Sequence, residues 1–123
     1  MAFQSFGDLE VWKRACRLAV QVYEALRDSR DFGLKDQMTR SSVSIPSNIA
    51  EGVERGSRAD CSRFIHIAKG SAAELRTQIY IAQRADVLDK SVSNGLIKEC
   101  QEISAMLQSF ANHLKSNPLN TEH

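Results

Sequence analysis

The chain has 123 residues, of which 42% are hydrophobic and 25% charged, with only two prolines. This length favours one domain, and the balance of hydrophobic and charged residues argues against intrinsic disorder and for a globular fold. The formal net charge is +1, so no global electrostatic field attracts a polyanion, and contact with nucleic acid would require a local surface.

Cysteine usage and hydropathy indicate the environment of the chain. Its three cysteines, Cys16, Cys61 and Cys100, form neither a close pair nor a CxxC motif. An odd, scattered count argues against a disulfide framework and suits a reducing compartment. No N-terminal apolar run resembles a signal peptide, and no stretch is long and apolar enough to span a bilayer. We therefore expect a cytoplasmic protein without membrane contact.

The first predicted helix, residues 8–28, begins with Asp8 as its N-cap and carries two apolar rows. One row has heptad spacing and comprises Leu9, Trp12, Cys16, Ala19, Tyr23 and Leu26. The other row comprises Val11, Ala15, Leu18, Val22 and Ala25. The rows lie about 100° apart around the helix, and together they are wider than one bundle core needs. Either row can face the core; we take the second as the candidate interface with another copy of the chain.

The second predicted helix, residues 34–54, has Pro46 in its interior. Proline lacks the N–H that the carbonyl of Ser42 would accept, and its ring clashes with that carbonyl, so we expect a kink. Gly52 and Gly56 near its end are typical of helix stops. The segment around the proline either packs against a neighbouring helix or builds a ligand site, and its main residues are Ser44, Ile45, Pro46, Asn48, Ile49, Glu51 and Gly52.

The third and fourth predicted helices span residues 58–85 and 90–115, each with a continuous apolar row. Gly70 in the third helix costs about 1 kcal/mol relative to alanine, so we expect another helix to approach it closely. Four such helices joined by short turns predict an all-α fold. It is an antiparallel up-down-up-down four-helix bundle, a single domain over residues 1–123 with a frayed tail at 116–123.

The residues that usually carry catalysis are not arranged for it. His66, His113 and His123 have no histidine or carboxylate partner at metal-binding spacing, which predicts no metal site. Cys61 lies about 140° around a helix from His66, so we expect no Cys–His pair. No glycine-rich phosphate-binding motif occurs. We predict no cofactor and no enzyme active site; the enzymatic alternative would use the segment around Pro46.

Basic residues are unevenly distributed along the chain. Ten of the sixteen lysines and arginines lie between Arg27 and Arg84. They form either ordinary solvated helix faces or an arginine-bearing surface for phosphates. For the second case the candidate phosphate contacts are Arg40, Arg55, Arg58 and Arg63.

Three segments carry a family resemblance: residues 8–12 (DLEVW), 43–52 (VSIPSNIAEG) and 64–75 (FIHIAKGSAAEL). In this order they resemble the 23S rRNA intervening-sequence proteins, over about residues 6–84. The resemblance implies a four-helix bundle that assembles as a homopentameric ring, and it implies no catalytic residues. A related group, the accessory proteins of diversity-generating retroelements, is similar in its pentameric barrel and binds nucleic acid and a reverse transcriptase.

The sequence thus predicts a non-enzymatic oligomeric scaffold or binding module, with a pentamer implied by the resemblance. A ring interface would bury the second apolar row of the first helix. RNA or DNA is the first partner to expect, because copying a local arginine surface around a ring makes it multivalent. The alternative is an adaptor that holds another polypeptide in an apolar groove or on the ring surface.

Overall fold

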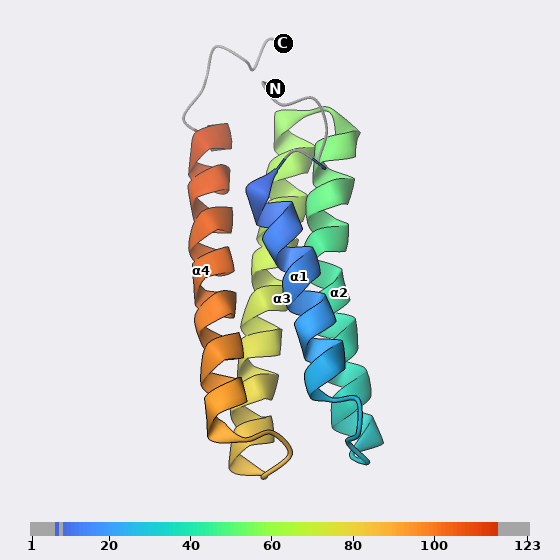
Figure 1. Ribbon diagram of the computed structural model, residues 1–123. Coiled ribbons are helices and arrows are strands. Elements are labelled where there is room, and N and C mark those ends of the chain that lie inside the picture. Colours follow the sequence, from blue (N-terminus) through green and yellow to red (C-terminus); the bar gives the residue numbers. More distant parts are fainter. Residues whose placement is uncertain (1–6, 8, 116–123) are drawn as a thin grey trace.

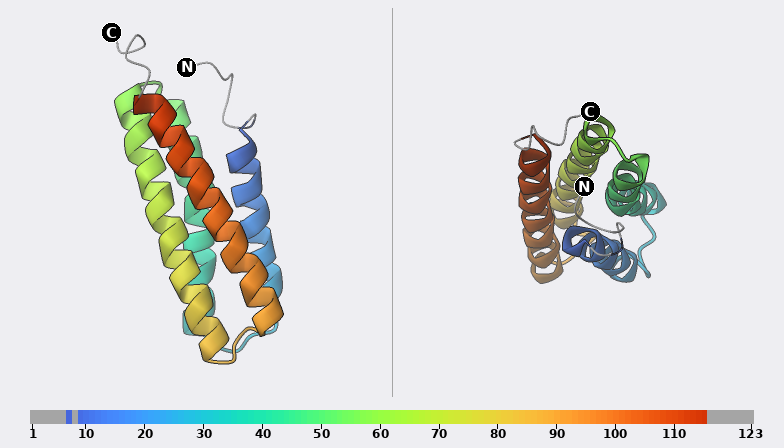
Figure 2. Two further views of the ribbon diagram at one scale, coloured as in Figure 1. Left: turned by 90° about the vertical axis from the view of Figure 1, so that its left-hand side faces the viewer. Right: turned by 90° about the horizontal axis from the view of Figure 1, so that it is seen from above.

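The computed structural model describes residue 7 and residues 9–115, which form an all-α four-helix bundle. Its helices are α1 (Glu10–Ala25), α2 (Phe32–Arg55), α3 (Arg58–Arg84) and α4 (Lys90–Lys115). Consecutive helices run in opposite directions, so α1 begins at the end of the bundle where α4 ends (Figure 1). Viewed end-on, the four helices lie at the corners of a rough square and follow one another around it in chain order (Figure 2). Each helix therefore packs against two neighbours.

Side-chain caps set where three helices begin, because they accept hydrogen bonds from backbone N–H groups that have no partner inside the helix. The caps are Asp31, Ser57 and Asp89, which accept from Leu34 N at 3.1 Å, Asp60 N at 3.1 Å and Val92 N at 2.8 Å. The cap at Asp31 makes α2 begin earlier than the apolar pattern predicts. Asp8, predicted to cap the first helix, and the predicted frayed tail at 116–123 lie outside the described residues.

One of the four helix ends differs by more than one residue from its predicted position. The first helix ends at Ala25 and not at residue 28. Gly56 follows α2 with φ = 82°, a left-handed conformation that glycine adopts without strain, and ends the helix as predicted. Gly52, also predicted as a stop, lies inside α2, and the helix continues through both Pro46 and Gly52.

The core is aliphatic and receives one row of side chains from each helix. Its largest fully buried members include Leu18, Leu26, Met38, Ile45, Ile49, Ile65, Leu75, Ile79, Ile103 and Leu107. Burial of each such side chain contributes about 1.5–3 kcal/mol, so the core is the main source of stability. Within the described part of the chain, no helix combines the length and apolar character that a membrane crossing needs.

Candidate functional site

The segment around Pro46 lies along the contact between α2 and α3. The Oγ atoms of Ser44 and Ser71 are 2.8 Å apart, which joins the two helices by a hydrogen bond. The Nδ2 of Asn48 donates to the carbonyl oxygen of Ser44 at 2.8 Å and to its Oγ at 3.0 Å. The hydroxyl and amide groups of the segment thus bind one another, while Ile45, Pro46 and Ile49 are buried.

The close approach of α3 explains why this segment contains a glycine at position 52. A Cβ atom built on Gly52 would lie 2.9 Å from the Cβ of Phe64 and 3.2 Å from the carbonyl oxygen of Cys61. These distances are shorter than ordinary contacts, so α3 can approach α2 this closely because residue 52 has no side chain. Glu51, on the exposed side of α2, pairs instead with Arg55 at 2.9 Å. The segment is therefore largely a packing motif.

Gly70 behaves differently from the expectation. A Cβ atom added at Gly70 would meet nothing within 4 Å, and the residue is exposed on α3. The close approach of a helix predicted there does not occur within the described chain.

The row predicted as an oligomer interface faces the chain's own core, which corrects that assignment. Four of its five residues are at most 6% exposed and the fifth is half-buried: Val11, Ala15, Leu18, Val22 and Ala25. Both α2 and α4 pack beside α1, so this row is covered without a second copy of the chain. The other row is divided: Tyr23 is exposed, Leu9, Trp12 and Cys16 are half-buried, and Ala19 and Leu26 are buried in the core.

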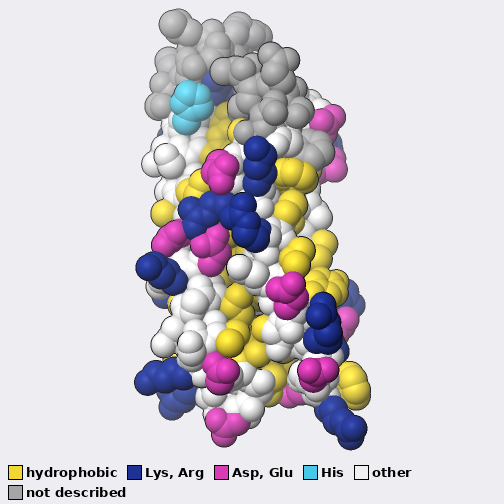
Figure 3. Space-filling view, in the orientation of Figure 1, with side chains coloured by type: hydrophobic (Ala, Val, Ile, Leu, Met, Phe, Trp, Pro, Cys, Tyr) yellow, Lys and Arg dark blue, Asp and Glu magenta, His cyan; other side chains and the backbone are white. Residues whose placement is uncertain are grey.

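We call the surface left uncovered at the junction of α1 and α2 the outer apolar band. It includes the exposed side chains of Val20 and Tyr23 on α1 and of Phe32 and Val43 on α2. Half-buried residues border them: Leu9, which precedes α1, Trp12 and Cys16 on α1, and Ala50 on α2. Val20, Tyr23 and Phe32 are 56%, 51% and 69% exposed. Figure 3 shows hydrophobic side chains along the boundary between α1 and α2 over much of this face. Contiguous exposed apolar surface is unusual on a monomer and typically marks an interaction site.

The four arginines predicted to contact phosphates do not form one site. Arg40 and Arg55 both belong to α2, but they are fifteen residues apart, or about 22 Å along the helix. Arg55, Arg58 and Arg63 lie around the turn between α2 and α3. The guanidinium carbons of Arg55 and Arg63 lie 5.0 and 4.5 Å from the ring centre of Phe64.

Most of these arginines are already neutralised. Arg40 pairs with Asp36 at 3.1 Å, Arg55 with Glu51 at 2.9 Å, and Arg63 lies 3.9 Å from Asp60. Each pair is exposed and spans one helix turn, so it contributes little stability, but it removes the local excess of positive charge. Arg58 differs: its Nη1 donates to the carbonyl oxygen of Leu114 at 2.8 Å, near the end of α4.

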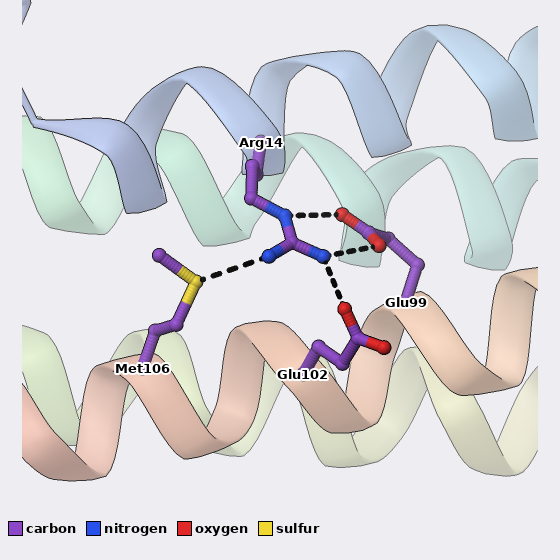
Figure 4. A network of polar contacts seen from close by, with 4 residues as sticks. All are labelled: Arg14, Glu99, Glu102 and Met106. Atoms are coloured by element: carbon purple, nitrogen blue, oxygen red, sulfur yellow. Dashed lines mark hydrogen bonds and ion pairs between the residues drawn. The ribbon is translucent and has the colours of Figure 1, made fainter.

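A cluster of charged side chains joins α1 to α4 (Figure 4). The spacing of these residues along the sequence does not predict it. The Nε of Arg14 donates to one carboxylate oxygen of Glu99 at 2.9 Å, and its Nη2 donates to the other at 2.6 Å. The same Nη2 donates to Glu102 at 2.6 Å. These hydrogen bonds raise the pKa of Arg14 and lower the pKa of Glu102 below its ordinary value of 4.5.

An open hollow of about 690 Å³ lies beside this cluster. Its walls include Arg17 and Gln21 of α1 and Gly95 and Leu96 of α4. Helix α1 therefore meets α4 through a bidentate ion pair beside an open space, at the edge of the core that both helices share.

Thiol and imidazole groups are placed for structure. Burial raises the pKa of the Cys61 thiol to about 11 and that of Cys100 to about 12, which keeps both thiols protonated at neutral pH. The Nδ1 of His66 lies 2.8 Å from the carbonyl oxygen of Ser62, and because a carbonyl can only accept, Nδ1 carries the proton. Among residues 9–115, His, Cys, Asp and Glu side chains form no group of three that could hold a metal ion.

Comparisons with known proteins identify the relatives of this bundle. A model of the family described as 23S rRNA-intervening sequence protein matches residues 7–109. The chain is also similar to the crystal structure of a protein with unknown function from the S23 ribosomal protein family of Bacteroides thetaiotaomicron. That likeness has 26% sequence identity, a TM-score of 0.78, and coverage of 82% of this chain and 97% of that chain. No curated protein matches the chain. Since the family model spans most of its length, the chain belongs to the 23S rRNA-intervening sequence protein family.

Proposed function

We propose that this protein is a non-enzymatic helical module that assembles with copies of itself and presents a shared surface to a macromolecular partner. The observation that carries the proposal is the outer apolar band, where Val20, Tyr23 and Phe32 are each more than half exposed. Burial of each such side chain contributes about 1.5–3 kcal/mol, so a few of them at each contact would sustain a stable assembly.

A ring of copies would cover such a band on every copy. The band lies on one side of the bundle, at the junction of α1 and α2 (Figure 3). A band that meets a different face of the next copy is a heterologous contact, which closes into a ring when the rotation allows. The pentamer that the family resemblance implies is the assembly we propose, with nucleic acid, and RNA first, as its partner.

The assembly is tested by light scattering coupled to size-exclusion chromatography. We expect the wild type to have five times the mass of the 13.7 kDa chain. The variant Val20→Asp places a charge in the band, so it should run as a monomer with its helical circular dichroism intact. The matched control Ser109→Asp adds the same charge at an exposed position of α4 and should keep the wild-type mass.

A core substitution separates association from folding. Leu18→Asp buries a charge in the chain's own core, where Leu18 is 0% exposed, and should abolish helicity altogether. The proposal fails if the wild type is a monomer, or if Val20→Asp leaves the mass of the oligomer unchanged.

An adaptor for another polypeptide is the second candidate, and the same band favours it. A wild-type monomer whose band is protected from hydrogen exchange by one purified partner protein, with Val20→Asp abolishing that protection, would support the adaptor over the ring.

A further inference from the structure

Helix α3 is the most basic helix of the bundle, with five lysines and arginines against two acidic residues. Three of the five lie eleven and seven residues apart, which places them within about 20° of one another around the helix. These three are Arg58, Lys69 and Arg76. The two acidic residues, Asp60 and Glu74, each stand two residues from one of them, about 200° away on another side.

The row of cations on α3 faces α4, and α3 and α4 lie side by side in both views of Figure 2. Arg58 donates to the carbonyl oxygen of Leu114 at 2.8 Å, and the Nζ of Lys69 donates to Gln108. We call this surface the basic seam; it comprises Arg58, Lys69, Arg76 and Arg84 of α3 and Lys115 of α4.

The basic seam gathers cations that have no carboxylate partner along one side of the bundle. Within the described residues, none of its five cations forms an ion pair with an acidic side chain, whereas Arg14, Arg40, Arg55 and Arg63 all do. The acidic residues of α4, Glu99 and Glu102, are held on its other side by Arg14. The protein is nearly neutral overall, and on this face five cations lie along the contact of two helices with no ion pair among the described residues.

Two open hollows lie along the seam. The first, of about 380 Å³, has walls that include Arg58, Ser62 and His66 of α3 and Gln108, Asn112 and Lys115 of α4. No aspartate or glutamate is among its lining residues. Cations and amide side chains together offer donors to phosphate oxygens and to base edges.

The second hollow, of about 390 Å³, contains an aromatic ring. Its walls include Arg76 and Tyr80 of α3 and Ile97 of α4, again without a carboxylate. Tyr80 is 52% exposed, and Arg84 lies 5.5 Å from its ring centre and donates to its hydroxyl at 2.7 Å. An exposed tyrosine beside arginines is the combination on which unpaired bases stack.

We propose that the basic seam binds single-stranded nucleic acid, with phosphates on its cations and a base on Tyr80. Its charge complements a phosphodiester backbone, and the row from Arg58 to Arg84 extends about 39 Å along the helix. The hollows admit flipped-out bases, which a duplex would not offer. This inference rests on the binding module proposed above and names its partner and the surface that holds it.

Fluorescence anisotropy with a fluorescein-labelled 20-nucleotide RNA of mixed sequence, measured at several salt concentrations, tests the proposal. For single strands the logarithm of affinity falls with the logarithm of salt concentration by about 0.7 for each phosphate contact. The double variant Arg76→Gln with Arg84→Gln should bind at least about tenfold more weakly at 100 mM salt, with a slope shallower by about 1.4.

The matched control is the double variant Arg40→Gln with Arg63→Gln. It removes the same charge from exposed arginines that are already paired with carboxylates, so its affinity should stay within about threefold of wild type with an unchanged slope. Tyr80→Leu should weaken RNA binding by roughly tenfold at constant slope, because stacking involves no counterion release. DNA of the same sequence should bind similarly, since phosphates and base faces are common to both.

Two results would overturn the proposal that the basic seam binds RNA. One is no binding of the RNA by wild type at 50 mM salt, and the other is an equal loss of RNA affinity in the seam and control double variants. Light scattering on the same samples separates this inference from the proposed assembly. A monomer that binds RNA through Arg76 and Arg84 would refute the ring and retain the seam, whereas an oligomer without RNA binding would do the reverse.

Discussion

Where α2 meets α3, the backbones approach so closely that a methyl group on Gly52 would lie 2.9 Å from the Cβ of Phe64. Where α1 meets α4, the long side chain of Arg14 reaches Glu99 and Glu102 beside an open hollow. Both pairs of helices contribute to one apolar core. The α2–α3 contact depends further on the close fit of the two backbones at Gly52, whereas the α1–α4 contact adds partly exposed ion pairs at its edge.

The largest effect is expected from Gly52→Ala. The added methyl group would clash with Phe64 and with the backbone of Cys61, so the free energy of unfolding should fall by about 1–3 kcal/mol despite the higher helix propensity of alanine. Urea denaturation followed by circular dichroism measures the change. Gly70→Ala is the control: the site is open, so stability should rise by about 0.5–1 kcal/mol. If both alanines shift stability in the same direction, the close packing at Gly52 is not the cause.

A smaller effect is expected from Arg14→Gln, which breaks the bidentate pair with Glu99. Because these side chains are about a quarter exposed, solvent screening limits the loss of stability to about 0.5–1 kcal/mol. The loss should shrink at 1 M salt, and amide exchange should quicken in α1 more than in α2 or α3. Arg17→Gln is the comparison, because Arg17 lies on the same helix without an ion pair among the described residues. An equal effect of the two variants would contradict a specific bridge.

The smallest effect is a dependence on pH. The pKa of Glu102 is lower in the folded chain than its ordinary value of 4.5, because Arg14 donates to the carboxylate. The stabilisation is therefore complete above about pH 4.5 and disappears as the pH falls through the lowered pKa of the folded state. Thermal unfolding from pH 7 to pH 3 should show the difference between wild type and Glu102→Gln narrowing below pH 4.5. A gap that stays constant over this range would contradict the assignment.

The helices were predictable because the spacing of apolar residues is a local property of the chain. Three helices begin at single capping residues. One of these caps, Asp31, accepts from the N–H of Leu34 and makes α2 begin earlier than the apolar pattern predicts. The kink expected at Pro46 stays a prediction. Which of the two rows on α1 faces the core could not be predicted from the sequence. Both rows are apolar, and the row that is buried depends on where α2 and α4 lie.

The candidate surfaces were less predictable than the fold. Arg14 and Glu99 are 85 residues apart, and no local pattern links them. The predicted phosphate contacts at Arg40, Arg55 and Arg63 did not take into account that nearby carboxylates pair with these arginines. The four-residue spacing of Arg40 from Asp36, and of Arg55 from Glu51, already permits such pairing within one helix turn. The whole-turn spacing of Arg58, Lys69 and Arg76 was the available signal for the basic seam.

The position of Cys16 has a practical consequence for work with this protein. Cys16 is half-buried within the outer apolar band, whereas Cys61 and Cys100 are buried and their thiols have strongly raised pKa values. A maleimide dye should therefore attach to Cys16 first, without any engineered cysteine. In the proposed assembly a bulky adduct at that position would separate neighbouring copies, so alkylation of Cys16 during purification should lower the mass of the particle measured by light scattering.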